Sequence, residues 1–315
     1  MERKLKIVFL DAGTIGEDVS LEPISSLGEF VSYYATAPQD VFDRISDCDV
    51  LVVNKVEIRK PQIDCAKNLK LICVAATGTN NIDIEYANSK NVIVKNVADY
   101  STQSVAQVTM AMLLGLSCKI PYYDYKVKSG IYSNGISASD VSRIFNELDG
   151  QTLGIIGLGN IGRRVASLAS AFGMKIVYYS TAKKPHSTQY QHLELDELLA
   201  QSDYISIHAP LNDNTRNLIT YSKLRLCKPT ANIINIGRGA IMNEEDVVRA
   251  LNEGVIAGIG IDVYSQEPLP KDSPYHNIED KTKAILLPHI GWASHTARTV
   301  VVERMAEHIV NFMNQ

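Results

Sequence analysis

The sequence lacks several features that would place it in a specialised class of protein. None of its apolar runs reaches the roughly 18 residues that a membrane-spanning helix requires. Residues 1–6 lead straight into the strand-like run over residues 7–10, without the apolar region and cleavage site of a signal peptide. The chain has only five cysteines, an odd number with no C-x-x-C pair. We therefore expect reduced thiols and a cytoplasmic protein that spans no membrane.

The sequence also lacks a strong net charge. Its 31 basic and 35 acidic residues leave a formal net charge of −4. Sequence-independent binding of nucleic acid needs a basic surface, so we expect no nucleic-acid partner. The hydrophobic fraction of 45% and the charged fraction of 21% are ordinary for a globular protein. With 315 residues, the chain is long enough for two domains.

Short β-rich runs alternate with helix-like stretches along most of the chain. Strands separated by helical crossovers predict parallel sheets with helices on their faces. The first series of strand-like runs covers residues 6–10, 50–54, 69–75 and 92–96. The second series covers residues 152–157, 175–180, 204–208, 231–236 and 258–263, with a further candidate at 284–287. Helices are expected over 101–116, capped by Ser101 or Thr102, and over 294–312, capped by Ser294.

Two segments follow neither pattern. Residues 121–149 are polar and rich in tyrosine, and they contain Gly130, Asn134 and Gly135. We expect an irregular arm between domains or subunits there. Residues 11–16 follow a strand-like run but lack the glycine spacing of a nucleotide-binding turn, so an ordinary loop is expected.

The strongest local motif is Gly-Leu-Gly-Asn-Ile-Gly, from Gly157 to Gly162. Alone it is weak evidence, but here a strand-like run precedes it, and a helical stretch and another strand-like run follow. In such a unit Gly157 permits a tight turn, Gly159 lets the backbone approach a pyrophosphate, and Gly162 allows close packing. The phosphates then meet amides at a helix N-terminus. The order of elements predicts dinucleotide binding, with a purely structural turn as the alternative.

Ser180 stands about 20 residues beyond these glycines, where NAD-binding folds usually carry an acidic residue. That acid accepts hydrogen bonds from the ribose 2′-hydroxyl. A hydroxyl and two lysines, Lys183 and Lys184, are available here to receive a 2′-phosphate instead. The alternative is that both lysines point into solvent. The sequence leans towards NADP(H).

Three polar residues, Arg238, Glu267 and His289, each follow an apolar strand-like run. Ligands of open α/β sheets bind beyond the carboxyl ends of the strands, so the three side chains could converge on one crevice. Each has a simpler explanation, as a surface charge at a turn, an exposed loop carboxylate and a packed or solvent-facing histidine. Taken singly, none of them predicts catalysis.

Together these features resemble the D-isomer-specific 2-hydroxyacid dehydrogenase family, over essentially the whole chain. The matching motifs are residues 157–162, 208–210, 235–239, 260–263, 267–268 and 288–290. Residues 75–83, 100–102 and 290–294 look most like the glycerate dehydrogenase (hydroxypyruvate reductase) branch. The resemblance implies an enzyme that transfers a hydride between NAD(P)H and a small 2-keto acid, giving the D-2-hydroxy acid. Hydroxypyruvate and glyoxylate fit the branch, and a D-lactate-type activity is an alternative.

The resemblance also implies roles for the three polar residues. Arg238 would hold the substrate carboxylate and polarise the C2 carbonyl. His289 would give a proton to the carbonyl oxygen as the hydride arrives, and Glu267 would orient the imidazole and stabilise its protonated form. Formate dehydrogenases resemble this fold but pair glutamine with the histidine, so Glu267 argues against them. The expected substrate contacts are Thr77, Gly78, Arg238, His289 and Trp292, although Trp292 could equally pack at a domain junction.

Asp262 is expected to contact the carboxamide side of the nicotinamide. No metal site is expected. The expected cofactor contacts are Gly157, Gly159, Asn160, Ile161, Gly162, Ser180, Thr181, Lys183, His208, Pro210, Thr215, Ile236, Gly237, Asp262 and His289.

The family pattern predicts two Rossmann-like, doubly wound α/β domains with parallel sheets. Residues 1–99 and 289–315 would form a flavodoxin-like substrate domain, and residues 100–288 an NAD(P)-binding Rossmann domain. The arm over 121–149 would serve a homodimer. A competing hypothesis is a nucleotide-sensing scaffold like the C-terminal-binding-protein corepressors, which add peptide-binding surface and tails. The sequence shows no appended disordered segment, which favours the enzyme.

Overall fold

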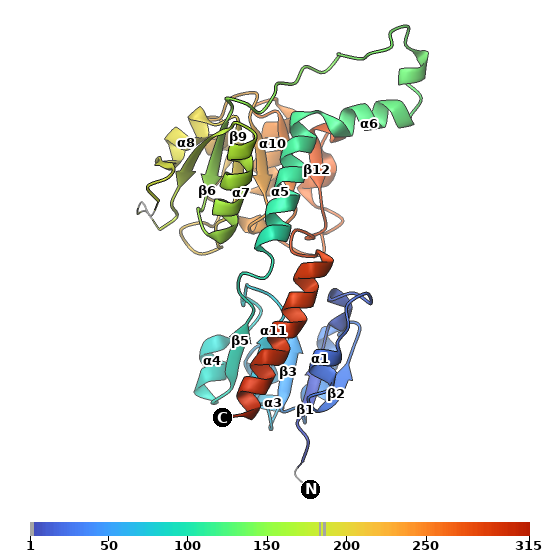
Figure 1. Cartoon of the computed structure of the whole chain (residues 1–315), viewed down its shortest axis with the longest axis vertical. Coiled ribbons are helices and arrows are strands. Elements are labelled where there is room, and N and C mark those ends of the chain that lie inside the picture. The colour runs from blue at the N-terminus through green and yellow to red at the C-terminus, as the bar shows by residue number, and fades with distance from the viewer. Residues whose placement is uncertain (1–2, 183, 185–186) are drawn as a thin grey trace. The chain divides into compact units, whose positions relative to one another are not determined.

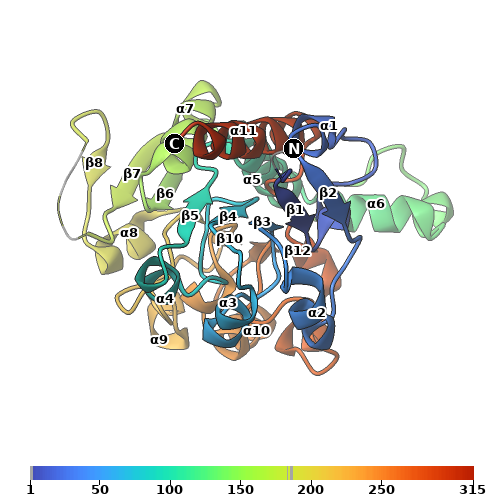
Figure 2. The same cartoon turned by 90° about the horizontal axis from the view of Figure 1, so that it is seen from below.

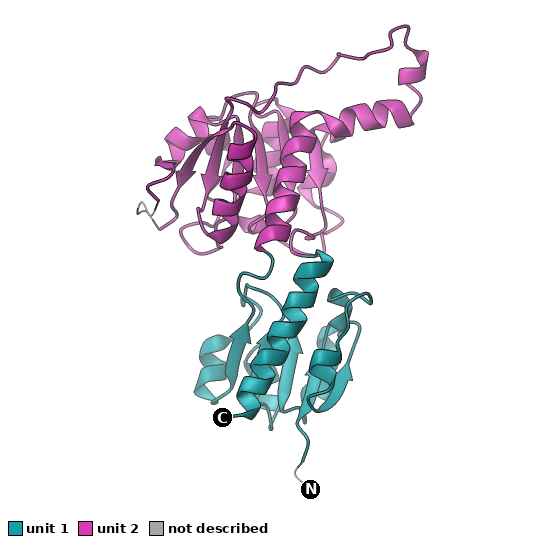
Figure 3. Cartoon of the chain, in the orientation of Figure 1, with its two compact units in different colours: residues 1–101, 293–315 teal, residues 102–292 magenta. Residues whose placement is uncertain are grey.

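The computed structural model describes residues 3–182, 184 and 187–315 of the chain. Two compact units are present (Figure 3): unit 1 is Met1–Ser101 with Ala293–Gln315, and unit 2 is Thr102–Trp292. The sequence analysis placed the two crossings after residues 99 and 288. Residues 289–292 therefore belong to unit 2 in the structure, although the sequence analysis grouped them with the substrate domain.

Unit 1 is built on a parallel sheet of five strands, in the order β2-β1-β3-β4-β5. The two strands beside β1 are set in register by pairs such as Ile7 with Phe30 and Ile7 with Val50. The sequence analysis missed β2, because this edge strand is only half buried and carries no apolar run. The strands are β1 Lys6–Phe9, β2 Glu29–Ser32, β3 Val50–Val53, β4 Leu71–Val74 and β5 Ile93–Asn96.

Helices cover both faces of this sheet, with α1 and α11 on one face and α2, α3 and α4 on the other (Figure 2). Both faces are therefore apolar, and every residue of β3 and β4 is buried. The predicted cap of α11 is confirmed, since Oγ of Ser294 accepts a hydrogen bond from the amide of Ala297 at 3.2 Å. The helices are α1 Glu22–Ser25, α2 Val41–Ile45, α3 Lys60–Cys65, α4 Ile84–Ser89 and α11 His295–Met313.

Unit 2 is built on a parallel sheet of seven strands, in the order β12-β11-β10-β9-β6-β7-β8. From β6 the chain first builds outward through β7 and β8, and then returns to add β9 on the other side. The carboxyl ends of β6 and β9 thus form the switch point where such sheets bind ligands. The strands are β6 Thr152–Ile156, β7 Lys175–Tyr179, β8 Gln191–His192, β9 Tyr204–Ile207, β10 Asn232–Asn235, β11 Gly258–Ile261 and β12 Ala284–Leu286.

Alternate side chains of these strands fill two apolar layers. Ile234 packs with α5 and α7, whereas Ile233 packs with α8, α9 and α10 on the opposite face. The helices are α5 Thr102–Ser117, α7 Asn160–Ala171, α8 Leu195–Gln201, α9 Tyr221–Leu224 and α10 Glu244–Asn252. In the described part of the chain no single helix is long and apolar enough to cross a membrane. Only α5 and the helix that follows it, α6 Ile120–Lys128, meet those criteria together, and they are bent by 67° with α5 mostly buried.

The arm is partly helical, which corrects the expectation that residues 121–149 are irregular. Helix α6, Ile120–Lys128, begins with Pro121 in its first turn and ends with Lys126 and Lys128 in its last, both favourable positions. The rest of the arm contains only a short 3-10 turn, Tyr132–Asn134. In Figure 1, α6 and the segment after it extend away from the seven-stranded sheet.

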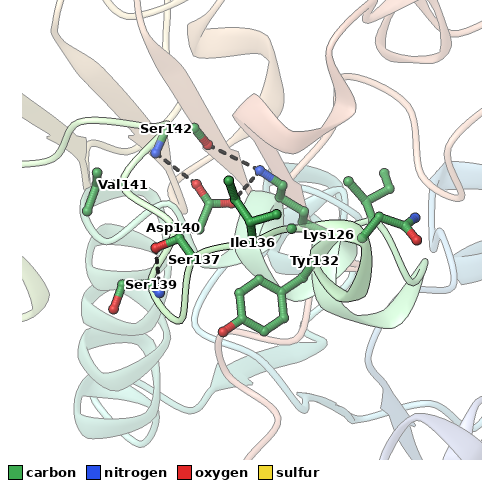
Figure 4. Close-up of a pocket in the computed structure, with 11 residues that line it drawn as sticks. Lys126, Tyr132, Ile136, Ser137, Ser139, Asp140, Val141 and Ser142 are labelled. Carbon is green, nitrogen blue, oxygen red and sulfur yellow. Dashed lines mark hydrogen bonds and ion pairs between the residues drawn. The ribbon is translucent and has the colours of Figure 1, made fainter.

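The returning limb of the arm folds back on α6, around a shallow pocket (Figure 4). Nζ of Lys126 forms an ion pair with Asp140 and donates a hydrogen bond to Oγ of Ser142 at 3.4 Å. The hydroxyl of Tyr123 donates to the carbonyl of Arg143 at 2.9 Å. These contacts give the arm a defined shape without a core of its own.

Candidate active site

The glycine-rich turn has the geometry that the motif predicts. Gly157 follows β6 with φ of +93°, a conformation that side chains rarely adopt. A Cβ at Gly162 would lie 2.4 Å from the carbonyl oxygen of Gly157, so α7 can approach β6 only with glycine there. A Cβ at Gly159 would meet nothing within 4 Å. The turn is thus tightly packed at Gly157 and Gly162, whereas Gly159 faces open space. There the backbone at the start of α7 can face a pyrophosphate.

The segment after β7 carries the residues expected to select the cofactor. Ser180 directly follows β7 and is 2% exposed, and Thr181 comes next in a turn. Lys183, another predicted contact, lies outside the described residues. Ser180 thus places a hydroxyl, and no carboxylate, directly after β7.

His208 and Thr215 lie in the loop after β9, beside the glycine-rich turn. Nε2 of His208 is 2.8 Å from Oγ of Ser206, and burial lowers the pKa of the imidazole to about 3. The hydroxyl of Thr215 donates to the carbonyl of Pro210 at 2.7 Å and accepts from the amide of Asn212 at 2.8 Å. Because Thr215 is fully buried, its side chain shapes the loop that presents Pro210.

Arg238 is presented by a tight turn after β10. Asn235, buried at the end of the strand, accepts from the amide of Gly237 at 3.1 Å and donates to the carbonyl of Arg238 at 3.0 Å. Nη1 of Arg238 donates to the carbonyl of Gly237 at 2.8 Å. The sequence analysis included Asn235 in a matching motif but gave it no role, although a polar residue that ends an otherwise apolar strand was a usable signal.

His289 and Glu267 form a pair. Nδ1 of His289 is 2.7 Å from Oε2 of Glu267, and Oε1 of Glu267 accepts from the amide of Tyr264 at 3.1 Å. The side chains of His289 and Glu267 are 23% and 31% exposed, so the pair is accessible to a ligand. A carboxylate on Nδ1 fixes the tautomer and leaves Nε2 as the nitrogen that can exchange a proton.

Strand order brings the loops of these three residues together. Arg238 follows β10, Glu267 lies in the loop after β11 and His289 follows β12, and these strands are neighbours in the sheet. A Cβ at Gly239 would lie 2.0 Å from the carbonyl carbon of Tyr264, so the first two loops touch directly. Because β10, β11 and β12 are parallel neighbours, the three loops follow their carboxyl ends at the same edge of the sheet.

Asp262 lies beside the backbone of the His289 loop, and its contact with the nicotinamide stays a prediction. It directly follows β11, is 1% exposed, and its Oδ1 and Oδ2 accept hydrogen bonds from the amides of Ile290 and Gly291, both at 2.8 Å. Burial raises the pKa of Asp262, and the two amide hydrogen bonds work in the opposite direction. The carboxylate of Asp262 therefore fixes the backbone next to His289 through these two hydrogen bonds.

Two of the predicted substrate contacts belong to unit 1. Thr77 and Gly78 follow β4, where Oγ1 of Thr77 donates to the carbonyl of Val97 at 3.1 Å and Nδ2 of Asn96 donates to the carbonyl of Thr77 at 2.7 Å. Trp292 ends unit 2 and packs, partly buried, against the apolar layer of α5 and α7. This packing lies within unit 2, and contact of Trp292 with the substrate stays a prediction.

Unit 1 contains a buried carboxylate that the sequence analysis missed. Asp11 follows β1 in a segment expected to be an ordinary loop, and its oxygens accept from the amides of Asn54, Lys55 and Val56 at 2.8, 2.6 and 3.2 Å. Asp11 thereby joins the carboxyl ends of β1 and β3. Across the described residues, no group of His, Cys, Asp or Glu side chains could hold a metal ion.

Comparison with known proteins identifies the family. Residues 110–291 match the NAD-binding domain of the D-isomer specific 2-hydroxyacid dehydrogenases. A hydroxypyruvate reductase of Blautia hydrogenotrophica is 32% identical over 98% of this chain and 97% of that protein.

Two solved structures share the fold of the whole chain. An acyclic imino acid reductase, Bsp5, in complex with NADPH and D-Arg has a TM-score of 0.87 and 28% identity, covering 99% of this chain and 98% of that one. D-lactate dehydrogenase of Aquifex aeolicus, complexed with NAD and lactic acid, has a TM-score of 0.85 and 26% identity, covering 98% and 95%. The chain is an oxidoreductase with a nicotinamide cofactor, and it belongs to the D-isomer-specific 2-hydroxyacid dehydrogenase family, in the branch of the hydroxypyruvate reductases and glycerate dehydrogenases.

Proposed function

We propose that this enzyme reduces hydroxypyruvate or glyoxylate to the D-2-hydroxy acid, with His289 as the residue that transfers the proton. The observation that carries the proposal is the 2.7 Å contact between Nδ1 of His289 and Oε2 of Glu267. This contact orients the imidazole and supports a proton at Nε2, which a keto acid needs when its carbonyl becomes a hydroxyl. A D-lactate-type activity on pyruvate is the alternative within the family.

In the proposed reaction, Arg238 binds the substrate carboxylate and polarises the C2 carbonyl. A nicotinamide cofactor, when bound, would supply the hydride that C2 receives. His289 gives its Nε2 proton to the carbonyl oxygen, so that the C=O double bond becomes a C–OH bond. Glu267 stabilises the imidazolium before the transfer. In the oxidative direction, Nε2 accepts the hydroxyl proton instead.

The residues around the glycine-rich turn fit a dinucleotide. The open side of the turn at Gly159 would hold the pyrophosphate, and the loops after β9 and β10 would border the nicotinamide half. Asn160, Ile161, His208, Pro210, Ile236 and Gly237 are the further contacts proposed there. Thr77 and Gly78 remain the substrate contacts predicted for unit 1.

NADP(H) is the proposed cofactor form. Ser180 places a buried hydroxyl, and no carboxylate, at the position that contacts the ribose 2′-oxygen in this fold. A carboxylate there would repel a 2′-phosphate, whereas a hydroxyl can donate a hydrogen bond to it.

A homodimer assembled through the arm is the proposed oligomeric state. Ile136, Val141 and Ile144 are 108%, 84% and 85% exposed, and they lie within a single short stretch of chain. Large exposed apolar side chains gathered in one segment are typical of an interface between proteins. Isologous dimers are the commonest way to cover such a surface.

The function is tested with a panel of 2-keto acids against NADH and NADPH, followed by a variant of the proton carrier. His289→Asn should lower kcat by about 100-fold or more, the scale of general acid–base catalysis, with unchanged cofactor affinity. The matched control is His276→Asn, since His276 is an exposed histidine of the same unit.

Near-full activity of His289→Asn would refute the mechanism. Absence of turnover by the wild type with every 2-keto acid would refute the enzyme proposal, and would favour a nucleotide-sensing scaffold.

A further inference from the structure

The backbone on the carboxyl side of His289 is held by a buried carboxylate. Both oxygens of Asp262 accept amide hydrogen bonds at 2.8 Å, from Ile290 and Gly291, the two residues that follow His289. We infer that Asp262 is a positioning residue, which fixes the His289 imidazole for proton transfer by clamping the peptide groups beside it. The inference rests on the proposed role of His289, and it gives Asp262 a task separate from contact with the nicotinamide.

A second side chain completes the clamp from another direction. Oγ of Ser104, on α5, donates a hydrogen bond to the carbonyl of Gly291 at 2.6 Å, and this contact is buried. Gly291 is thus held at its N–H by Asp262 and at its C=O by Ser104. A Cβ at Gly291 would lie 2.8 Å from Oδ2 of Asp262 and 2.8 Å from Cδ1 of Ile236, so the clamp closes on a bare backbone.

The conformation of His289 explains why a clamp is needed. Its φ of +55° lies in the left-handed region, which an L residue avoids unless the surroundings enforce it. On the other side, the hydroxyl of Tyr264 donates to the carbonyl of Leu287 at 2.9 Å. With Asp262 and Ser104 in place, the backbone is fixed both before and after His289. Without them, relaxation of φ would swing the imidazole away from Glu267.

The two possible tasks of Asp262 predict different behaviour for Asp262→Asn. The asparagine carbonyl can accept one of the two amides, but its NH2 group would face the N–H of the other. If Asp262 positions His289, kcat should fall on the order of 100-fold, because small misplacements of a catalytic group have effects of this size. The Kd of NADPH should stay unchanged. Ser104→Ala, which leaves the carboxylate intact, should lower kcat in the same way but less.

A readout that does not depend on turnover is hydrogen exchange in the cofactor-free chain. A peptide spanning residues 288–292 should exchange faster in Asp262→Asn and in Ser104→Ala than in the wild type. The matched control is Asp203→Asn. Oδ2 of Asp203 also accepts a backbone amide, that of Thr152 at 2.9 Å, but at the amino-terminal edge of the same sheet. This control should keep both kcat and the exchange of residues 288–292.

Several results would overturn the inference. A raised Kd for NADPH in Asp262→Asn, with unchanged exchange at 288–292, would make Asp262 a cofactor contact. Unchanged kcat in that variant would exclude a positioning role. If Asp262→Asn fails to fold, Ser104→Ala provides the test. A Ser104→Ala variant whose kcat and hydrogen exchange equal those of the wild type would exclude the positioning role. Absence of turnover in the wild type would refute the proposed function instead. The hydrogen-exchange data separate that outcome from a failure of the positioning inference, because they do not depend on turnover.

Discussion

Burial keeps the imidazole of His208 in its neutral form. Its Nδ1 is covered and has no hydrogen-bond partner among the described residues, while Nε2 contacts Oγ of Ser206. A protonated imidazole would need a hydrogen-bond acceptor at both nitrogens, which explains why burial lowers the pKa to about 3. The ring at the end of β9 is therefore neutral at all pH values at which such an enzyme works.

This shift predicts a loss of stability in mild acid. In the unfolded chain the pKa of His208 returns to about 6.5, so below that pH the unfolded state binds a proton that the folded state does not. The free energy of unfolding should fall, as the pH drops from about 6.5 towards 3, by up to about 1.4 kcal/mol per pH unit from this group. Urea unfolding at pH 7.5 and 5.5, followed by fluorescence of Trp292, the single tryptophan, measures it in unit 2.

Comparing the pH dependence of the free energy of unfolding between variants separates the contribution of His208 from that of the carboxylates. His208→Gln should lose less stability between the two pH values than the wild type, and His276→Gln, at an exposed site, should match the wild type. Equal pH dependence of wild type and His208→Gln would contradict the assignment.

Some residues of the site could be predicted from the sequence and others could not. Arg238, Glu267 and His289 could be predicted from the sequence, because polar residues directly after an apolar run are unusual. Strand order places the ends of such runs together. The bond between Ser104 and Gly291 joins positions 187 residues apart, so only the packed fold creates it. Asp262 was recognised as a site residue, but its partners were not. Similarly, nothing local signals that the carboxylate of Asp11 would cap the 54–56 loop.

Among the elements, β7 carries the clearest test of cofactor choice, at its carboxyl end. The wild type should prefer NADPH, and Ser180→Asp should lower the ratio of kcat/KM for NADPH over NADH at least tenfold. A tenfold change corresponds to about 1.4 kcal/mol, a modest effect for a carboxylate facing a phosphate. Steady-state kinetics with both cofactors measures the ratio.

The control is Ser222→Asp, at an exposed position of helix α9, which adds the same charge elsewhere on unit 2. If the wild type prefers NADH and Ser180→Asp leaves the ratio unchanged, Ser180 has no part in selection.

Central elements were easier to predict than peripheral ones. Strands such as β3 and β4 are buried at every residue, and they appear in the sequence as continuous apolar runs. The edge strands β2 and β8 are short and partly exposed, and they carry no such run. Helix α6 has no buried residue at all, so it has no core-facing stripe that a periodicity could reveal.

For the whole molecule, the arm predicts the oligomeric state. The wild type should sediment as a dimer at micromolar concentration. Ile144→Asp should weaken the dimer, because a charge in an apolar interface loses hydration without gaining a partner. Sedimentation velocity over a concentration series measures the shift. Phe172→Asp is the control, since Phe172 is 46% exposed and lies outside the arm. A monomeric wild type would contradict the proposal.

The assignment of chain segments to units depends on long-range packing. Helix α11 follows unit 2 in the sequence, yet its side chains Val301, Val302, Met305 and Ile309 pack on strands of unit 1. Its apolar stripe would suit many sheet faces, and alternation of strands and helices does not specify which one. Only the resemblance to a family suggested that the closing helix returns to the first domain.

This return has a consequence for biosynthesis. The ribosome makes β1 to β5 first, but one face of their sheet, including Ile7, Phe9 and Leu71, has only α1 to cover it until residues 293–315 emerge and form α11. Unit 2 is a continuous stretch, and its own core can close while the nascent chain is still growing. The unit whose translation starts first is therefore the last to finish folding, and its uncovered strands need protection from aggregation for the whole interval.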